Sequence, residues 1–169
     1  MILVEADSSE DWDSKTDWAQ LAKAAVRAAV AESDVAGLLE SGLAAEVSVR
    51  FTSDDEVKAL NAAWRGKDKA TNVLSFPMVE PGQLASLERS KGGETLLGDI
   101  VLARGICGAE ARAKGIDACT HAAHLVVHGT LHLLGCDHER GEGEAEAMEA
   151  AERRALARLG IADPYEIHP

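Results

Sequence analysis

The stretch from residue 117 to residue 134 most constrains how this chain can fold. Its apolar residues lie on most sides of the expected helix and do not form a single stripe. They include Leu125, Val126, Val127, Leu131, Leu133 and Leu134. A helix that is apolar around most of its circumference has to be buried. We therefore expect a central helix with the other elements packed around it.

The same helix carries histidines in a spacing that suits one metal ion. His128 and His132 are four residues apart, so they lie on one face, one turn from each other. Gly135 can adopt a positive φ and turn the chain back toward that face, which brings in His138. Three neutral imidazoles suit Zn²⁺, and a catalytic zinc ion keeps its fourth position for water. The spacing predicts one zinc ion per chain, held by His128, His132 and His138.

Alternative roles for the histidines remain open, because a histidine on an apolar helix is usually a packed residue. His124 also precedes His128 by four residues, and His121 lies on the same stripe. Neither is followed by a glycine turn that would supply a third ligand. We interpret both as packed residues, or as residues that orient a ligand by hydrogen bonding. Cys136 lies inside the motif but points differently from His138, so we do not expect a thiolate ligand.

Periodic patterns along the rest of the chain predict an α+β fold. Strands are expected over residues 1–6, 46–52, 71–76 and 96–103, with helices over residues 17–32, 54–65, 107–114, 117–134 and a last segment ending at 159. The second of these helices should point Val57, Leu60, Ala63 and Trp64 inward. Residues 77–95 should form a long loop of the kind that serves as a lid or a partner-binding flap. We predict a single domain, residues 1–169, with a mixed sheet of about four strands and helices around a buried metal-binding helix.

Composition limits the classes of partner. The 169 residues include 46% hydrophobic and 27% charged residues, which is typical of a soluble globular protein. The net charge of −12 and the 4% of aromatic residues disfavour a general affinity for nucleic acid, so any such role needs a local basic patch. The apolar runs are too short to span a bilayer, and the N-terminus lacks the basic start of a signal peptide. We expect a cytoplasmic protein with no membrane partner.

The spacing H-x-x-x-H-x-x-G-x-x-H matches the zinc pattern of metzincin peptidases except at one position. Gly129 stands where those enzymes carry the glutamate that acts as general base, so a peptidase would lack its base. Glycine in an exposed helix costs about 1 kcal/mol relative to alanine. We therefore expect another backbone or a substrate to approach Gly129 closely.

Three segments resemble, in order, the YbeY family of bacterial metal-dependent endoribonucleases. They are residues 60–77 (LNAAWRGKDKATNVLSFP), 96–100 (LLGDI) and 128–138 (HGTLHLLGCDH), and DPY near the C-terminus extends the match. Two positions depart from the usual family pattern. Ala70 stands in place of a proline and would loosen a turn, and Cys136 stands in place of a tyrosine and removes a hydroxyl near the metal.

The resemblance implies a zinc-dependent, single-strand-specific endoribonuclease. It implies a role in maturing the 3′ end of small-subunit (16S) ribosomal RNA and in ribosome quality control. The implied partners are single-stranded rRNA, the small ribosomal subunit and its associated proteins. The implied zinc ligands are His128, His132 and His138, and we predict Arg65 and His132 as catalytic residues.

Arg65, Lys67 and Lys69 are the predicted substrate-binding residues. A guanidinium can bind phosphate bidentately and stabilise the negative charge of the transition state. The alternative for Arg65 is a structural salt bridge, and the alternative for the lysines is a pair of solvated turn charges. We expect the basic turn and the histidine motif to be two halves of one site. Two other functions remain: a ribosome-assembly factor with a mainly structural metal, and a metallopeptidase-like hydrolase.

Overall fold

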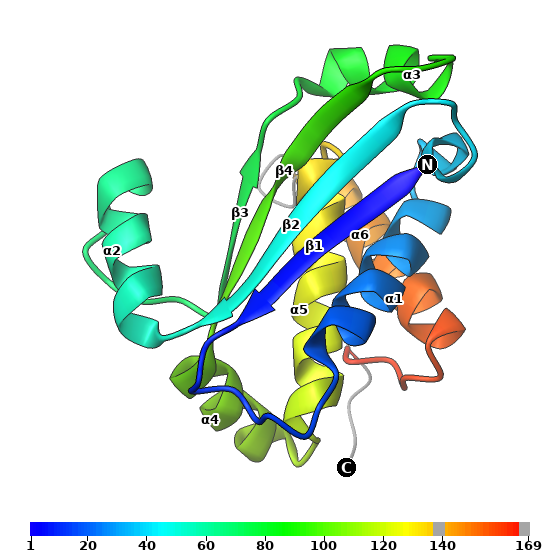
Figure 1. Ribbon diagram of the computed structural model, residues 1–169. Helices are drawn as coiled ribbons and strands as arrows, with labels where there is room; N and C mark the ends of the chain where they lie inside the picture. The colour runs from blue at the N-terminus through cyan, green and yellow to red at the C-terminus, as the bar shows by residue number, and fades with distance from the viewer. Residues whose placement is uncertain (137–140, 166–169) are drawn as a thin grey trace.

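The computed structural model describes residues 1–136 and 141–165 and has one mixed sheet at its centre (Figure 1). The strands, in their order across the sheet, are β1 (Ile2–Ser8), β2 (Ala44–Thr52), β4 (Glu94–Ala103) and β3 (Val73–Pro77). The first three are parallel, and β3 pairs antiparallel with β4 at one edge. The predicted four-stranded mixed sheet is confirmed.

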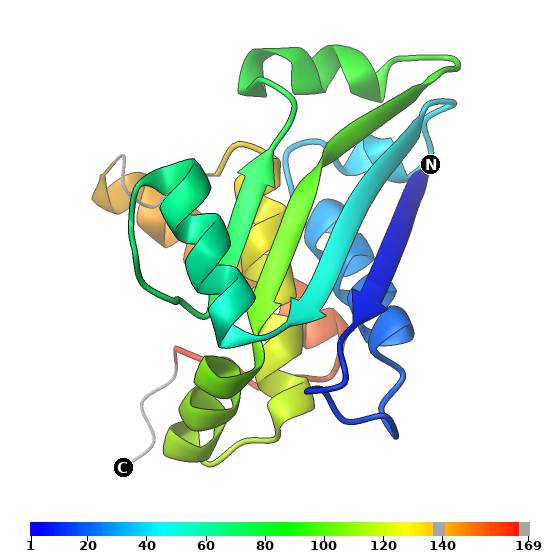
Figure 2. The ribbon, with the colours of Figure 1, turned by 60° about the vertical axis from the view of Figure 1, so that its left-hand side comes forward.

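Helices cover the two faces of the sheet unequally. The described helices are α1 (Trp18–Ala31), η1 (Ala36–Leu39), α2 (Asp54–Arg65), α3 (Pro81–Glu88), α4 (Arg104–Lys114), α5 (Ala118–Leu133) and α6 (Glu142–Arg158). α5 packs against β3 and β4, α1 packs against β1, and α6 packs on α1 and α5. α2 lies on the other face, in front of β3 and β4 in Figure 2. Within the described part of the chain, no helix is long and apolar enough to cross a membrane.

α5 is the buried central helix that its composition predicts. Eleven of its 16 residues are buried. It contacts α1, α4 and α6 as well as two strands, so apolar side chains on nearly every side of it find a partner. The α+β arrangement around this helix is therefore confirmed.

The segment predicted as a long loop contains helix α3. Pro81 occupies the first turn of this helix, where a proline is tolerated because its missing N–H would have no intrahelical acceptor. Leu84 is 3% exposed and belongs to the main core. A Cβ added at Gly135 would lie 3.2 Å from Pro81 Cβ, so α3 packs over the C-terminal end of α5. The loop prediction is wrong because proline and glycine here belong to a packed helix.

α2 begins and ends as predicted but buries less of its surface. Ser53 Oγ accepts a hydrogen bond from the Glu56 amide at 3.2 Å, and Gly66 ends the helix with a φ of 69°. Val57 is buried, whereas the side chain of Trp64 is 74% exposed. Ala63 and Trp64, predicted to point inward, are both exposed, because no other element of the described chain covers the last turn of α2.

A bulge in β4 depends on a glycine. Glu46 pairs with Leu96 and Val47 pairs with Gly98, so Leu97 is an extra residue in β4. Gly98 has a φ of 153°, and a Cβ there would collide with the Phe76 carbonyl oxygen of β3. It would also lie 2.6 Å from Leu133 of α5. A side chain at this position would push β3 and α5 away from β4.

Replacement of Gly98 by alanine should therefore destabilise the protein. We expect Gly98→Ala to lower the free energy of unfolding, measured by urea denaturation, by about 2–3 kcal/mol. Gly92→Ala is the matched control, because a Cβ at Gly92 meets no atom within 4 Å. Equal stability of the two variants would contradict the close approach of β3 to Gly98.

Candidate metal centre

His128 and His132 direct their Nε2 atoms toward each other from successive turns of α5. The two Nε2 atoms are 3.1 Å apart, and the ring planes are inclined by 77°. A tetrahedral zinc ion with Zn–N distances of about 2.0–2.1 Å places two nitrogen ligands roughly 3.3 Å apart. Both rings are partly exposed. The pair therefore has the spacing of two ligands of one zinc ion.

The chain leaves α5 at Gly135 with the positive φ that was predicted. Gly135 has a φ of 91°, and its amide donates to the His132 carbonyl at 3.1 Å. The Cys136 amide donates to the Leu131 carbonyl at 3.0 Å, which completes a Schellman motif. His138 lies outside the described residues, so its role as third ligand stays a prediction. Within residues 1–136 and 141–165, no group of three His, Cys, Asp or Glu side chains is arranged to hold a metal ion.

Glu152 of α6 is a buried carboxylate directly behind His128. His128 Nδ1 donates to Oε1 at 2.5 Å, and His124 Nε2 donates to Oε2 at 3.0 Å. The Tyr165 hydroxyl also donates to Oε2. Burial raises the pKa of Glu152, but hydrogen bonds from His124, His128 and Tyr165 outweigh burial and lower this pKa to about 2. An ionised carboxylate therefore contacts a predicted metal ligand.

The two described histidines present nitrogen donors that fit a zinc ion. An ionised carboxylate only accepts hydrogen bonds, so the His128 Nδ1 that faces Glu152 carries a proton. In a neutral ring this leaves the lone pair on Nε2, the atom that faces His132. Metal-binding histidines commonly have such a carboxylate partner on their other nitrogen. Sequence reasoning missed Glu152, although a glutamate four residues after Met148 and four before Leu156 lies on the buried stripe of its helix.

The other two histidines of α5 are packed residues with carboxylate partners. His124 shares Glu152 with His128, and His121 Nε2 lies 2.8 Å from Glu110 Oε1. Burial lowers the pKa of His121, and the hydrogen bond to Glu110 opposes this shift. Burial also raises the pKa of the Cys136 thiol, which disfavours a thiolate there.

Gly129 faces the sheet. A Cβ at this position would lie 3.0 Å from Ile100 Cγ2 and 3.3 Å from Ile100 Cγ1 of β4. The close neighbour is thus a side chain, and the predicted approach of another backbone or of a substrate is wrong. A glutamate at position 129 would have no space between α5 and β4.

The basic turn after α2 is held by a buried asparagine. Arg65 is the last residue of α2, and Lys67 and Lys69 follow it with exposed side chains. Asn61 is 2% exposed; its side-chain Nδ2 donates to the Lys69 carbonyl at 2.8 Å, and its main-chain carbonyl accepts from the Lys67 amide at 3.2 Å. Among the described residues, no ion pair involves these three cations. No described carboxylate therefore forms the structural salt bridge that was the alternative role for Arg65. The sequence analysis did not single out Asn61. Its position four residues after Val57 places it on the buried face of α2, and a polar side chain on that face was the indication that it has a structural role.

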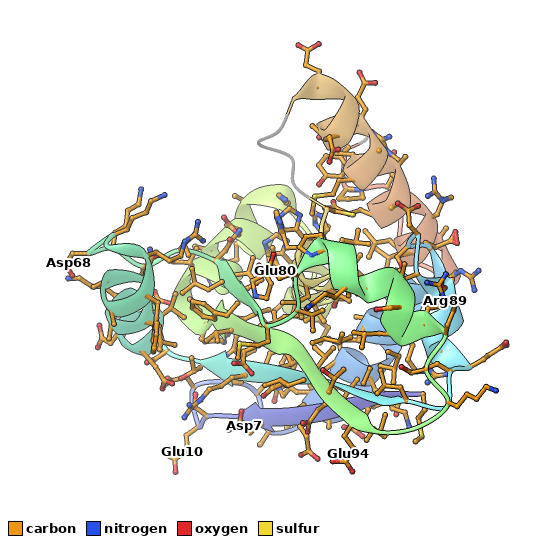
Figure 3. The ribbon with its side chains drawn as sticks, turned by 90° about the horizontal axis from the view of Figure 1, so that it is seen from above. Asp7, Glu10, Asp68, Glu80, Arg89 and Glu94 are labelled. Carbon is orange, nitrogen blue, oxygen red and sulfur yellow. The ribbon has the colours of Figure 1, made fainter. Side chains whose placement is uncertain are left out.

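The basic turn and the histidine pair lie on different sides of the strand pair β3–β4. α2 contacts one face of these strands and α5 contacts the other. Asp68, between the two lysines, projects from the edge of the molecule in the view from above (Figure 3). The two predicted halves of the site are therefore separated by edge strand β3, and a ligand of both has to pass around this strand.

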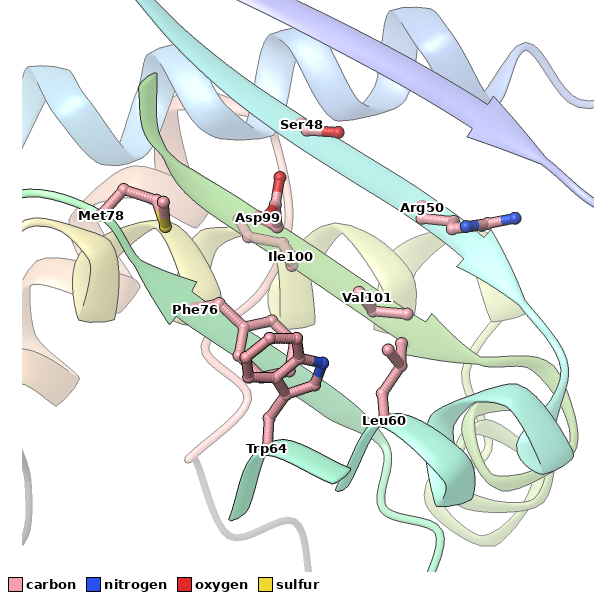
Figure 4. A pocket seen from close by; sticks show the side chains of 9 residues that line it. All are labelled: Ser48, Arg50, Leu60, Trp64, Phe76, Met78, Asp99, Ile100 and Val101. Carbon is pink, nitrogen blue, oxygen red and sulfur yellow. The ribbon is translucent and has the colours of Figure 1, made fainter. Parts of the chain in front are cut away.

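An apolar groove of about 490 Å³ adjoins the basic turn on the open face of the sheet. Its lining is shown in Figure 4 and consists of Ser48, Arg50, Leu60, Trp64, Phe76, Met78, Asp99, Ile100 and Val101. Trp64 stands at its rim, directly before Arg65 in the chain. Arg50 is paired with Glu56 at 3.0 Å, so its charge is partly neutralised. The sequence alone did not indicate this groove, because strands from distant segments form its floor.

The chain is similar to proteins of one family. A profile of the family described as Endoribonuclease YbeY matches residues 4–160. Proteins named Endoribonuclease YbeY are 56% identical in Rhizorhabdus wittichii (99% of this chain, 98% of the relative) and 50% identical in Zymomonas mobilis (99% and 95%). The solution structure of TM1509 from Thermotoga maritima supports the fold alone, with a TM-score of 0.55 and 22% identity over 99% of this chain and 100% of that one. The resemblance predicted from three sequence segments is confirmed, and the chain belongs to the Endoribonuclease YbeY family.

Proposed function

We propose that this protein is a zinc-dependent endoribonuclease that cleaves single-stranded RNA. The observation that carries the proposal is the convergence of the His128 and His132 Nε2 atoms, 3.1 Å apart, in front of a buried carboxylate. The relatives that are 50–56% identical to this chain are named as endoribonucleases. We further propose that the substrate is ribosomal RNA near the 3′ end of the small-subunit (16S) RNA, and that the protein acts in ribosome quality control.

The proposed site has a metal-binding part and a phosphate-binding part. His128, His132 and His138 would hold one zinc ion, which supplies a Lewis acid and a bound water of lowered pKa. Arg65 would bind the scissile phosphate through two parallel hydrogen bonds and stabilise the negative charge that develops there. Lys67 and Lys69 would attract the neighbouring phosphates.

The separation of the two parts favours a flexible single strand as substrate. A strand that contacts both has to bend around β3, and a stiff duplex cannot make that bend over a few nucleotides. Trp64 is 74% exposed beside Arg65, so a base next to the bound phosphate can stack on its indole ring. Because the net charge of −12 repels RNA elsewhere, we propose that proteins of the small ribosomal subunit help to recruit this one.

A metallopeptidase-like activity has less support. The position that carries the general base in metzincins is Gly129, and Ile100 fills the space that its side chain would need. The ribosome-assembly factor with a mainly structural metal is distinguished from the enzyme by the dependence of cleavage on Arg65 and on metal.

The first test is cleavage of labelled single-stranded RNA by the purified protein. We expect the wild type to cleave and a chelator to abolish cleavage. Arg65→Ala should reduce the cleavage rate by at least about 100-fold, as expected for loss of a group that stabilises transition-state charge. Arg112→Ala, which removes an exposed arginine of α4, is the matched control and should leave the rate unchanged. Equal cleavage by the wild type, Arg65→Ala and His132→Ala would indicate a contaminating nuclease and remove the enzyme claim.

Metal content tests the ligand assignment separately. We expect one zinc ion per chain in the wild type and a large loss in His132→Ala, because two histidines bind zinc more weakly than three. His121→Gln is the control on the same helix, since His121 pairs with Glu110 and not with Glu152. A full zinc complement in a triple variant of His128, His132 and His138 would show that the ligands lie elsewhere.

The salt dependence of RNA binding tests the role of the two lysines. Each phosphate contact that is lost should make the slope of log K against log salt less negative by about 0.7 for a single strand. We expect this change for Lys67→Ala and for Lys69→Ala, with weaker binding to RNA of any sequence. Lys23→Ala is the control, because Lys23 is an exposed residue of α1, and it should leave the slope unchanged. Unchanged slopes in the first two variants would identify the lysines as solvated turn charges.

A further inference from the structure

We propose that Glu152 is a positioning residue for metal binding, and that His124 and Tyr165 hold it in place. The inference rests on the zinc site proposed above and assigns roles to residues outside its ligand set. Glu152 contacts His128 through Nδ1, whereas the nitrogen that faces His132 is Nε2. Glu152 thus acts through His128 and is not itself placed as a ligand.

The hydrogen bond to Glu152 determines which nitrogen of His128 carries the proton. An imidazole without a partner distributes its proton over both nitrogens, and only the form with a free Nε2 lone pair can bind a metal through that atom. The Glu152 carboxylate accepts a hydrogen bond from Nδ1 at 2.5 Å and so keeps the proton there. The same contact fixes the rotation of the ring. Nε2 of His128 is thereby directed at Nε2 of His132, 3.1 Å away.

Glu152 is held in turn by two further hydrogen-bond donors. Its side chain is fully buried, and a buried carboxylate remains ionised only when several donors surround it. His124, one turn before His128 on α5, donates to the other carboxylate oxygen at 3.0 Å. The Tyr165 hydroxyl donates to that same oxygen. The carboxylate is therefore held from two successive turns of α5 and from the C-terminal segment.

Tyr165 is 41 residues after His124 in the chain but packs beside it. Its ring lies edge-on to the ring of His124, with 5.7 Å between the centroids, and the guanidinium of Arg153 lies 5.4 Å from its centroid. Arg153 also pairs with Asp163 at 3.0 Å. These contacts tie residues 163–165 to α6 beside Glu152. We infer that the C-terminal segment stabilises the metal-binding geometry of α5.

The test compares conservative variants of the whole 169-residue chain. Glu152→Gln keeps the size of the side chain and removes its charge, and Tyr165→Phe removes one hydroxyl. Glu146→Gln is the matched control, because Glu146 lies on the same helix α6 and is exposed. Two quantities are measured: zinc affinity, by competition with a chelating dye, and the imidazole ¹⁵N shifts of His128 in the metal-free protein.

We expect Glu152→Gln to weaken zinc binding by about 10- to 100-fold, the usual effect of losing a partner of a metal-binding histidine. Tyr165→Phe should weaken it less, and Glu146→Gln not at all. The ¹⁵N shifts should show the Nδ1–H form of His128 in the wild type and a mixture of both forms in Glu152→Gln.

Wild-type zinc affinity in both Glu152→Gln and Tyr165→Phe would overturn the positioning role and leave the zinc site intact. A lower unfolding midpoint for Glu152→Gln with His128 still in the Nδ1–H form would also overturn it, because Glu152 would then only stabilise the fold. If Glu152→Gln fails to fold, the zinc affinity of Tyr165→Phe alone tests the positioning role, and wild-type affinity in that variant would overturn it. A wild-type protein that binds no zinc would instead overturn the proposed metal centre.

Discussion

The burial of α5 is the constraint on which the rest of the structure depends. This helix carries four histidines, and burying an imidazole without a hydrogen-bond partner costs free energy. Two carboxylates from neighbouring helices supply partners: Glu110 of α4 for His121, and Glu152 of α6 for His124 and His128. The packing of α4 and α6 around α5 is thus determined by polar pairs as well as by apolar contact. The predicted metal ligands belong to the same system of contacts.

The sheet separates the two groups of predicted functional residues. The histidine pair lies at the C-terminal end of α5 on one face, and the basic turn follows α2 on the other. Asn61 fixes the turn, and the Schellman motif at Gly135 fixes the exit of the chain from α5. Specific hydrogen bonds thus hold the backbone next to the basic cations and next to the histidine pair, as positioning of a phosphate against a metal ion requires. The proposed substrate connects them around edge strand β3.

Local patterns were enough to predict much of this structure. The spacing of His128 and His132, the glycine exit at Gly135 and the end of α2 at Gly66 follow from contacts between residues close in sequence. The hydrogen-bond partners of the histidines cannot be predicted from such local contacts. Glu152 lies 24 residues after His128, and its helix packs on α5 only in the folded chain. The exposure of Trp64 could not be predicted for a similar reason. Helical periodicity defines one face of α2, but it does not say how much of that face the sheet covers.

The most direct measurement is the position of the metal in a crystal of the zinc-bound protein, located by anomalous scattering at the zinc edge. We predict one peak per chain, about 2.0–2.1 Å from the Nε2 atoms of His128 and His132 and bound also by His138, with His128 Nδ1 still hydrogen-bonded to Glu152. A peak at another set of residues, or zinc bound through Nδ1 of His128, would contradict it.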